Sequence, residues 1–246
     1  MDIEIYKLLL IAAAALVASL TQSVTGFGFG IVAMIFLPKL LLYTEANVLS
    51  SMLGMGTSIL VVLALYRSIN WKNLLFPLVG SLAANYFAIA FVKNAKNETL
   101  TLLLGVALLL LSIYFFFFSS KIKITPTWYT GLIAGTLSGV LGGLFSIGGP
   151  PVVIYYLQSE EDTNRYMATL STYFVLSNLA SISMKAASGF VTANVLLCLA
   201  TGLVGMLRGS FLGKRIRGGV NPKALRKAVY GVMAVSGIIN IIGSLL

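Results

Sequence analysis

The stretch Leu144-Phe145-Ser146-Ile147-Gly148-Gly149-Pro150-Pro151 decides how this chain folds. It lies between apolar segments and does not continue a helix, because glycine adopts backbone angles that other residues avoid and the two prolines lack an N–H. Proline fits best in the first turn of a helix, so the Pro-Pro pair predicts that a new helix starts there. We call residues 144–151 the second break.

A similar stretch, Thr25-Gly26-Phe27-Gly28-Phe29-Gly30, lies near the start of the chain and is named the first break. Backbone that leaves a helix inside hydrocarbon is tolerated only where protein or a water-filled cavity satisfies its polar groups. Two such breaks therefore predict an internal cavity. The free N–H groups and the positive dipole end of each restarting helix make that cavity suited to an anion.

The composition is that of an integral membrane protein. Of the 246 residues, 58% are hydrophobic and 10% are charged, whereas soluble domains are roughly half apolar and a quarter charged. Runs such as Leu100–Phe118 and Ala228–Leu246 are long enough to cross a hydrocarbon core of roughly 30 Å as helices. The strands of a membrane barrel would be short and alternating instead. We therefore predict an all-α integral membrane fold.

The residues present disfavour several classes of function. The chain has no His and a single Cys, Cys198, so the usual proton shuttle, the commonest metal ligand and an internal disulfide are all lacking. The sequence shows no metal-ligand cluster, no nucleophile with a base and no phosphate-binding loop. We expect no enzyme activity, no metal and no cofactor. The net charge of +10 collects between the spans, where it reports topology rather than nucleic-acid binding.

Ten helical segments are expected, five in each half of a single membrane domain. The first half comprises residues 1–118, a linker follows at 119–127, and the second half comprises residues 128–246. The segments of the first half are Ile5–Ser23, Ile31–Tyr43, Ala46–Tyr66, Asn73–Phe91 and Leu100–Phe118. Those of the second half are Trp128–Gly143, Pro150–Leu157, Arg165–Ser188, Val191–Leu212 and Ala224–Leu246.

The second half repeats the organisation of the first, since a shift of 120 residues lays Gly28 on Gly148. If every segment crosses, the halves are inverted, and eleven of the 17 Lys and Arg residues lie on one side with five on the other. If the short helices re-enter and return, eight crossings remain and the split is ten to six. The positive-inside rule favours the first count, and both place the termini outside. Matched broken helices in repeated halves point to a transporter binding site.

The two breaks resemble the paired signatures of a known family. Gly26-Phe27-Gly28-Phe29-Gly30 and the stretch from Gly142 to Pro151 are similar to those of the TauE/SafE sulfite exporter family, also called the sulfonate-uptake permease family. The resemblance covers essentially the whole chain and includes the spacing of Gly205, Gly209 and Gly213 before a basic loop. It implies transport of sulfite or another small sulfur-containing or carboxylate anion across the cytoplasmic membrane.

The candidate substrate site combines the backbone and hydroxyl donors of the two breaks, because an oxyanion needs several donors and few fixed charges if it is also to be released. The alternative, that the glycines only permit tight helix packing, explains two matched breaks less well. Gln22 either donates to the substrate or bonds a neighbouring backbone carbonyl. The residues expected at the site are Gln22, Ser23, Thr25, Gly26, Gly28, Phe29, Gly30, Ile31, Ser146, Gly148, Gly149, Pro150 and Asn178.

A few other polar residues lie within or beside the spans. Asn85 and Asn240 are expected to join helices to one another. Arg208 is expected to extend to the cytoplasmic interface, and Lys185 likewise to sit at a helix end. Glu45 is predicted to cap the helix that follows it, with a part in proton coupling as the alternative.

We therefore expect a secondary transporter that moves a small anion by alternating access between the two halves. The expected partners are the anionic substrate and the lipid bilayer, with no nucleic acid and with homo-oligomers left open. The expected location is the cytoplasmic membrane, with a prokaryote favoured. An anion channel is the main alternative, a membrane scaffold without transport comes next, and an integral membrane enzyme comes last.

Overall fold

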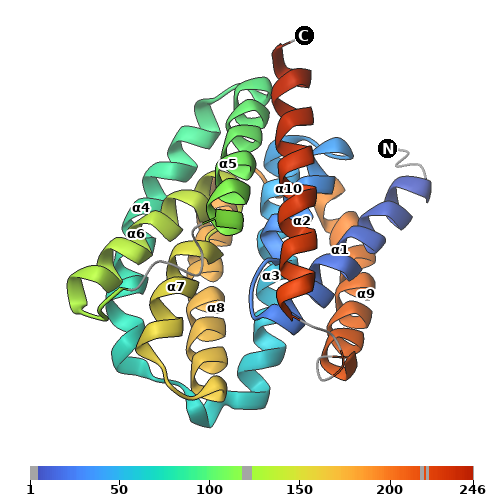
Figure 1. Cartoon of the computed structure of the whole chain (residues 1–246). Helices are drawn as coiled ribbons and strands as arrows, with labels where there is room; N and C mark the ends of the chain where they lie inside the picture. Colours follow the sequence, from blue (N-terminus) through green and yellow to red (C-terminus); the bar gives the residue numbers. More distant parts are fainter. Residues whose placement is uncertain (1–4, 118–123, 217–218, 220–221, 246) are drawn as a thin grey trace.

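The structure, a computed structural model, describes residues 5–117, 124–216, 219 and 222–245 (Figure 1). Within these ranges the chain forms ten α-helices and two short 3-10 helices, η1 (Leu37–Lys39) and η2 (Tyr66–Ser68). The α-helices of the first half are α1 (Ile5–Thr25), α2 (Phe29–Phe36), α3 (Tyr43–Leu65), α4 (Trp71–Asn94) and α5 (Asn97–Phe117). Those of the second half are α6 (Trp128–Phe145), α7 (Gly149–Ser159), α8 (Thr163–Ala187), α9 (Ala193–Ile216) and α10 (Pro222–Leu245).

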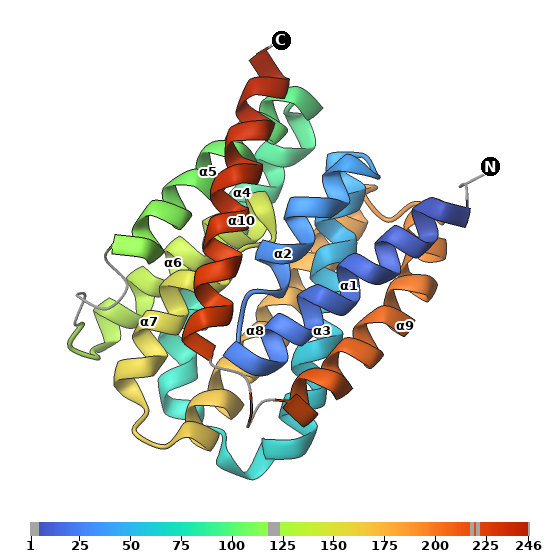
Figure 2. The ribbon, with the colours of Figure 1, turned by 45° about the vertical axis from the view of Figure 1, so that its right-hand side comes forward.

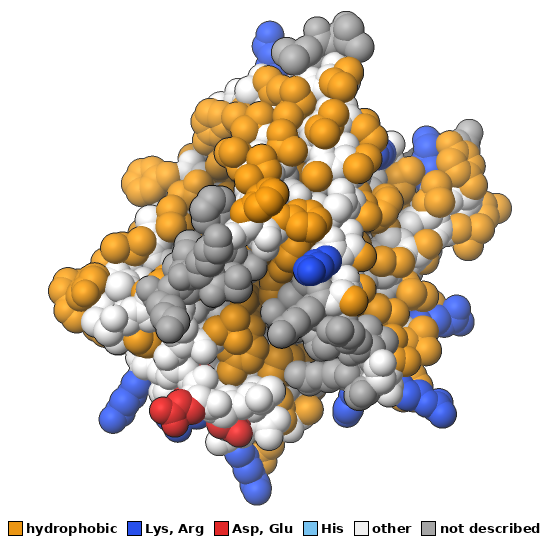
Figure 3. Space-filling view, in the orientation of Figure 1, with side chains coloured by type: hydrophobic (Ala, Val, Ile, Leu, Met, Phe, Trp, Pro, Cys, Tyr) orange, Lys and Arg blue, Asp and Glu red, His pale blue; other side chains and the backbone are white. Residues whose placement is uncertain are grey.

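Helix length and composition confirm the predicted all-α membrane fold. In the described part of the chain, seven helices are long and apolar enough to cross a membrane: α1, α3, α4, α5, α6, α9 and α10. Helix α8 has 25 residues but is more polar, as expected of a helix that lines an interior site. Apolar side chains cover most of the surface in Figure 3. Helices α2 and α7 have 8 and 11 residues and are too short to cross at ~1.5 Å per residue.

The first short helix ends earlier than the sequence predicts. Its α-helical part stops at Phe36, and Pro38 lies in the 3-10 turn η1 that follows, because proline has no N–H to donate to the preceding turn. The next helix accordingly begins at Tyr43. Of the predicted linker at 119–127, residues 119–123 lie outside the described ranges. Thr127 caps α6 by accepting from the backbone N–H of Thr130 at 3.3 Å.

The long helices pack in pairs that join the two halves. Helix α1 lies against α9, and α4 lies against α6 (Figures 1 and 2). Glycines make the approach close: a Cβ atom at Gly205 of α9 would lie 2.0 Å from the Ala12 carbonyl oxygen, and one at Gly135 of α6 would lie 1.9 Å from that of Pro77. Helix α5 packs against α10, and α3 packs against α8.

Each short helix turns back beside the long helix that precedes it. In both views α2 runs back toward the end of the molecule at which α1 begins, and α7 runs back toward the end at which α6 begins (Figures 1 and 2). The two hairpins point in opposite senses, α1–α2 opening upward in Figure 1 and α6–α7 downward. The start of α1 and the end of α10 both lie toward the upper end, whereas most Lys and Arg side chains on the face in Figure 3 project from the lower end.

Candidate functional site

The two breaks are in direct contact. A Cβ atom added to Gly30 would lie 1.8 Å from the carbonyl oxygen of Ser146, so only glycine allows the first break to approach the second this closely. The Phe27 ring lies against Gly149, 3.5 Å from where a Cβ of that glycine would be. Stretches about 120 residues apart in the sequence thus form one local structure.

The first break is shaped by two glycines and one threonine. Gly26 and Gly28 have φ values of 88° and 102°, which side chains other than glycine rarely adopt. The Thr25 hydroxyl lies 2.8 Å from the Thr21 carbonyl oxygen and 2.6 Å from that of Phe27, so it donates to the backbone on either side of the bend. Helix α2 then begins, and the N–H groups of its first turn have no partner within the helix.

The second break is held mainly by α3, a helix of the other half. Tyr43 and Asn47 of α3 donate to the Leu144 carbonyl oxygen at 2.6 and 2.7 Å. These bonds satisfy an acceptor that the end of α6 would otherwise leave without a partner. Ser146 has φ 58° and directs the chain away from α6. On the far side, the hydroxyl of Ser138 donates to the Gly148 carbonyl oxygen and accepts from Tyr173.

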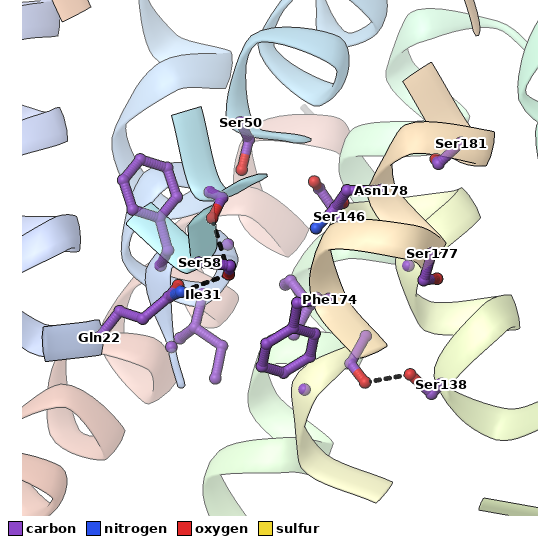
Figure 4. A pocket seen from close by; sticks show the side chains of 18 of the residues that line it. Gln22, Ile31, Ser50, Ser58, Ser138, Ser146, Phe174, Ser177, Asn178 and Ser181 are labelled. Atoms are coloured by element: carbon purple, nitrogen blue, oxygen red, sulfur yellow. Dashed lines mark hydrogen bonds between the residues drawn. The ribbon is translucent and has the colours of Figure 1, made fainter. Parts of the chain in front are cut away.

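A cavity of about 50 Å³ lies where the breaks meet. A cavity needs ~10–15 Å³ of such space to hold one water molecule, so this one holds a few waters or one compact ion. Figure 4 shows Gln22 and Ser58 on one side and Ser138 and Ser177 on the other, with Ser146 and Asn178 between. Nine of the predicted site residues line the cavity: Gln22, Gly28, Phe29, Gly30, Ile31, Ser146, Gly148, Gly149 and Asn178.

Four predicted site residues lie away from the cavity. Ser23 lines a separate groove that is formed mainly by α3, α8 and α9. Thr25 is engaged with the backbone of its own bend, as described above, and Gly26 packs against Met167 of α8. Pro150 faces an apolar pocket between α5, α6 and α7. Thr25 and Gly26 shape the first break and its packing against α8.

Several cavity residues were not predicted. Ser50, Gly54 and Ser58 line it from α3 at intervals of four residues, and Ser177 and Ser181 line it from α8 at the same interval. This spacing places each set on one helix face. The sequence carries the signal, a polar stripe in an otherwise apolar helix, but small residues at this spacing are also typical of helix packing. Asn85, expected to join helices, lines the cavity from α4, and Ser138 does so from α6.

Three of these side chains present polar atoms that have no hydrogen-bond partner among the described residues. They are the Ser50 hydroxyl, the Asn85 amide oxygen and the Ser181 hydroxyl, and the three side chains are 1%, 1% and 2% exposed. A buried polar group without a partner is costly, and nearly all such groups in proteins are paired. The cavity is therefore built for a polar occupant.

Gln22 bonds a side chain of α3 instead of the neighbouring backbone carbonyl that one of its two predicted alternatives named. Its amide nitrogen donates to the Ser58 hydroxyl at 2.9 Å, and that hydroxyl donates to the Gly54 carbonyl oxygen at 3.0 Å (Figure 4). The amide thus ties α1 to α3 at the wall of the cavity.

Lys185 lies in the last turn of α8, at a helix end as predicted, and its side chain is 0% exposed. Its ammonium donates to the Ser51 hydroxyl at 2.7 Å, and that hydroxyl lies 2.8 Å from the Ser146 hydroxyl. Arg208, by contrast, has an exposed side chain on α9, as expected of a residue that extends toward an interface.

Glu45 is buried in the first turn of α3 and does not line the cavity. Its carboxylate accepts from the Thr192 hydroxyl at 2.6 Å and from the Asn194 amide at 3.0 Å, at the start of α9. It therefore joins the N-termini of two helices, where a negative charge is favourable, instead of capping only its own. Within the described ranges, no three His, Cys, Asp or Glu side chains come together as a metal ion would require.

A family model and two known proteins each match most of the chain. A family model described as "Sulfite exporter TauE/SafE" matches residues 11–239. A Cupriavidus necator protein named "Probable sulfite/organosulfonate exporter TauE" is 23% identical over 222 residues, which cover 86% of this chain and 85% of that protein. A protein of Methanocaldococcus jannaschii named as a membrane transporter is 27% identical over 209 residues, covering 75% of this chain and 77% of the relative. No solved structure matches.

Proposed function

The chain belongs to the sulfite exporter TauE/SafE family of membrane transporters, and from this we propose that it carries a small oxyanion by alternating access. The substrate binds in the cavity between the two breaks. Sulfite, a small sulfonate or another compact organosulfur or carboxylate anion is the class of substrate that we propose. This class follows from the name of the matched family and of the Cupriavidus necator relative, together with the chemistry of the cavity.

One observation carries the proposal: a cavity at two restarting helices is lined by Ser50, Asn85 and Ser181, each of which has a polar atom without a hydrogen-bond partner among the described residues. Serine hydroxyls and a primary amide can each donate to an anion, the amide by turning its nitrogen inward. The first turn of α2 adds backbone N–H groups and a positive dipole end. Donors of this kind bind an oxyanion without a direct ion pair, which allows release.

The size of the cavity supports a compact substrate. With about 50 Å³ of space, it suits an ion of a few heavy atoms, such as sulfite. Longer sulfonates would need a side chain at its edge, such as the Phe174 ring, to move. We therefore propose sulfite-sized oxyanions as the preferred substrates.

The packing of the helices supports inverted repeats and alternating access. Under the shift of 120 residues, the pair α1–α9 corresponds to α6–α4 and the pair α3–α9 corresponds to α8–α4, so the main contacts between the halves have counterparts. The hairpins α1–α2 and α6–α7 point in opposite senses (Figure 2), as inverted halves require. Transporters built in this way rock one unit against the other around a fixed site.

The distribution of charge supports the proposed orientation. Each short helix returns toward the side on which the preceding long helix begins, so every loop lies on the same side as it would if all ten segments crossed. The split of Lys and Arg residues therefore stays eleven to five. We propose that the basic side is cytoplasmic and that both termini are outside, in a cytoplasmic membrane.

Flux measurements test the proposal. The purified protein in liposomes is expected to move sulfite faster than empty vesicles, with a rate that saturates and with exchange of labelled for unlabelled anion. Thiosulfate, methanesulfonate and acetate are compared under the same conditions. Rates equal to those of empty vesicles for every anion would refute transport, and currents that do not saturate would indicate a channel.

Serine variants connect the flux to the cavity. Ser50→Ala and Ser181→Ala each remove a buried hydroxyl without a partner, so each is expected to leave the protein equally stable or to stabilise it by about 1 kcal/mol. The same changes are expected to raise the KM for sulfite about 10-fold, since a donor to the substrate is lost. Unchanged KM values in both variants would place the binding site elsewhere.

A further inference from the structure

A positive charge lies at the edge of the cavity. Lys185 is on α8 one helical turn beyond Ser181, which lines the cavity. From its ammonium a hydrogen bond of 2.7 Å leads to Ser51, and the Ser51 hydroxyl lies 2.8 Å from that of Ser146. Because Ser146 is part of the cavity wall, two hydrogen bonds separate the ammonium from the space that the substrate would occupy.

The ammonium has no counter-ion among the described residues. Glu45 on the neighbouring α3 uses its carboxylate to hold Thr192 and Asn194. Arg165 and Glu160 form an ion pair between described residues, and Lys185 does not take part in it. A fully buried charge is costly unless an opposite charge compensates it, and in membrane proteins such charges mark pathways of substrates and ions.

We propose that Lys185 is the positioning residue that sets the charge preference of the anion site, acting through Ser51 and Ser146. This inference rests on the proposed function and adds the residue that supplies the positive charge. The residues that line the cavity include no Lys or Arg. Placed behind two hydroxyls, the ammonium attracts the anion over a short distance without forming the contact ion pair that would slow its release.

The Ser51 hydroxyl connects Lys185 to the cavity wall. It accepts from the ammonium, donates to the Asn47 carbonyl oxygen at 3.1 Å and lies 2.8 Å from the Ser146 hydroxyl. Ser51 therefore fixes the position of Ser146 relative to the ammonium. A neutral side chain at position 185 would lose the charge, and one without a donor would also leave Ser51 without this partner.

The charge dependence provides the test. Coulomb energy is proportional to the product of the charges, so a fixed cation attracts an anion of charge −2 twice as strongly as one of charge −1. The test measures the concentrations of thiosulfate and of methanesulfonate that half-inhibit sulfite uptake, at one pH below neutrality where neither competitor titrates. In Lys185→Met these concentrations are expected to rise on the order of 10-fold for methanesulfonate and on the order of 100-fold for thiosulfate.

Two further variants separate charge from structure. Lys185→Gln keeps a donor for Ser51 without the charge and is expected to show the same larger loss for thiosulfate. Arg208→Met removes a cation from the exposed surface of α9 and is expected to change neither concentration. Because the ratio of the two concentrations is taken within one preparation, it does not depend on how much protein folds.

Every outcome of this experiment either supports the proposal or overturns it. A larger rise for thiosulfate in both Lys185 variants supports the proposal. Equal rises for the two competitors, or no rise, would overturn it while leaving transport by the wild-type protein intact. Absence of saturable sulfite uptake in the wild-type protein would refute the proposed function, and this inference with it.

Discussion

Gly30 is the residue at which fold and function depend most directly on each other. At the second position of a helix, Gly→Ala would normally stabilise by up to about 1 kcal/mol. Here the new Cβ would lie 1.8 Å from the backbone oxygen of Ser146, and a backbone atom cannot move aside as a flexible side chain does. The close contact of the two breaks therefore requires glycine at this position.

We predict that Gly30→Ala abolishes sulfite uptake and lowers the free energy of unfolding by about 1–3 kcal/mol, since the breaks are forced apart. Thermal unfolding in detergent and uptake in liposomes measure the two effects. Gly231→Ala on α10 is the matched control, because a Cβ there has no atom within 4 Å. Wild-type uptake in Gly30→Ala would mean that the contact between the breaks is dispensable.

For single residues, the sequence predicts the local backbone conformation better than the direction in which a side chain points. The glycines at positions 26, 28 and 148 and the Pro-Pro pair predicted the breaks, because glycine permits backbone angles that other residues avoid and proline fixes φ. The cavity serines of α3 and α8 were not predicted, because the rotation of each helix about its axis depends on packing with its neighbours. Lys185 illustrates the same limit: its place in the last turn of α8 follows from the sequence, and its inward direction does not.

Helix α3 belongs to the first half of the chain but also holds the break of the second half. It contributes Ser50 and Ser58 to the cavity, and it holds the second break through Tyr43 and Asn47. Both donors share one acceptor, the carbonyl oxygen of Leu144. Loss of one leaves the acceptor with a partner, whereas loss of both leaves a buried carbonyl without one.

A double-mutant cycle tests this arrangement. Tyr43→Phe and Asn47→Leu are each expected to lower the free energy of unfolding by about 1 kcal/mol. The double variant is expected to lose more than the sum of the single losses, by about 1–2 kcal/mol, because the Leu144 carbonyl is then unpaired. Chemical unfolding in detergent gives the three values, and strict additivity would mean that the two donors do not act on one acceptor.

Glu45 belongs to the same helix and joins its start to that of α9. We predict that Glu45→Gln costs about 0.5–2 kcal/mol of stability, as does the loss of other capping interactions. Sulfite uptake and its dependence on an imposed proton gradient are expected to stay as in the wild-type protein. Loss of that dependence with transport retained would assign Glu45 to proton coupling.

The sequence also predicted the elements well where local signals are strong. Each of the ten expected helical segments has a counterpart among the described helices, since long apolar runs bounded by polar turns define membrane helices. The end of the first short helix was wrong by several residues, because Pro38 permits a 3-10 turn that apolar composition alone does not reveal.

For the whole molecule, the packing suggests which parts move together. The pairs α1–α9 and α4–α6 are locked by glycines against backbone atoms, which makes each pair a stiff unit. Both short helices lie between these pairs (Figures 1 and 2). Residues of α1, α4 and α6 are among those that line the cavity. We infer that alternating access moves one pair relative to the other about α3 and α8, with the two breaks as the contact that opens and closes.

The sequence carries part of this architecture. The matched breaks predicted two repeated halves and a site between them, and the contact of Gly30 with Ser146 fits that expectation. Which helix of one half packs on which helix of the other was not predictable, because the pairing depends on glycine faces that lie far apart in the chain.

The most direct test of the central claim is a structure of the protein with selenite, a heavier analogue of sulfite that anomalous scattering locates. We predict one selenium peak in the cavity between Gly30 and Ser146, with selenite oxygens within hydrogen-bond distance of the Ser50 and Ser181 hydroxyls. An ordered peak outside this cavity, with the cavity itself free of selenium, would contradict the account.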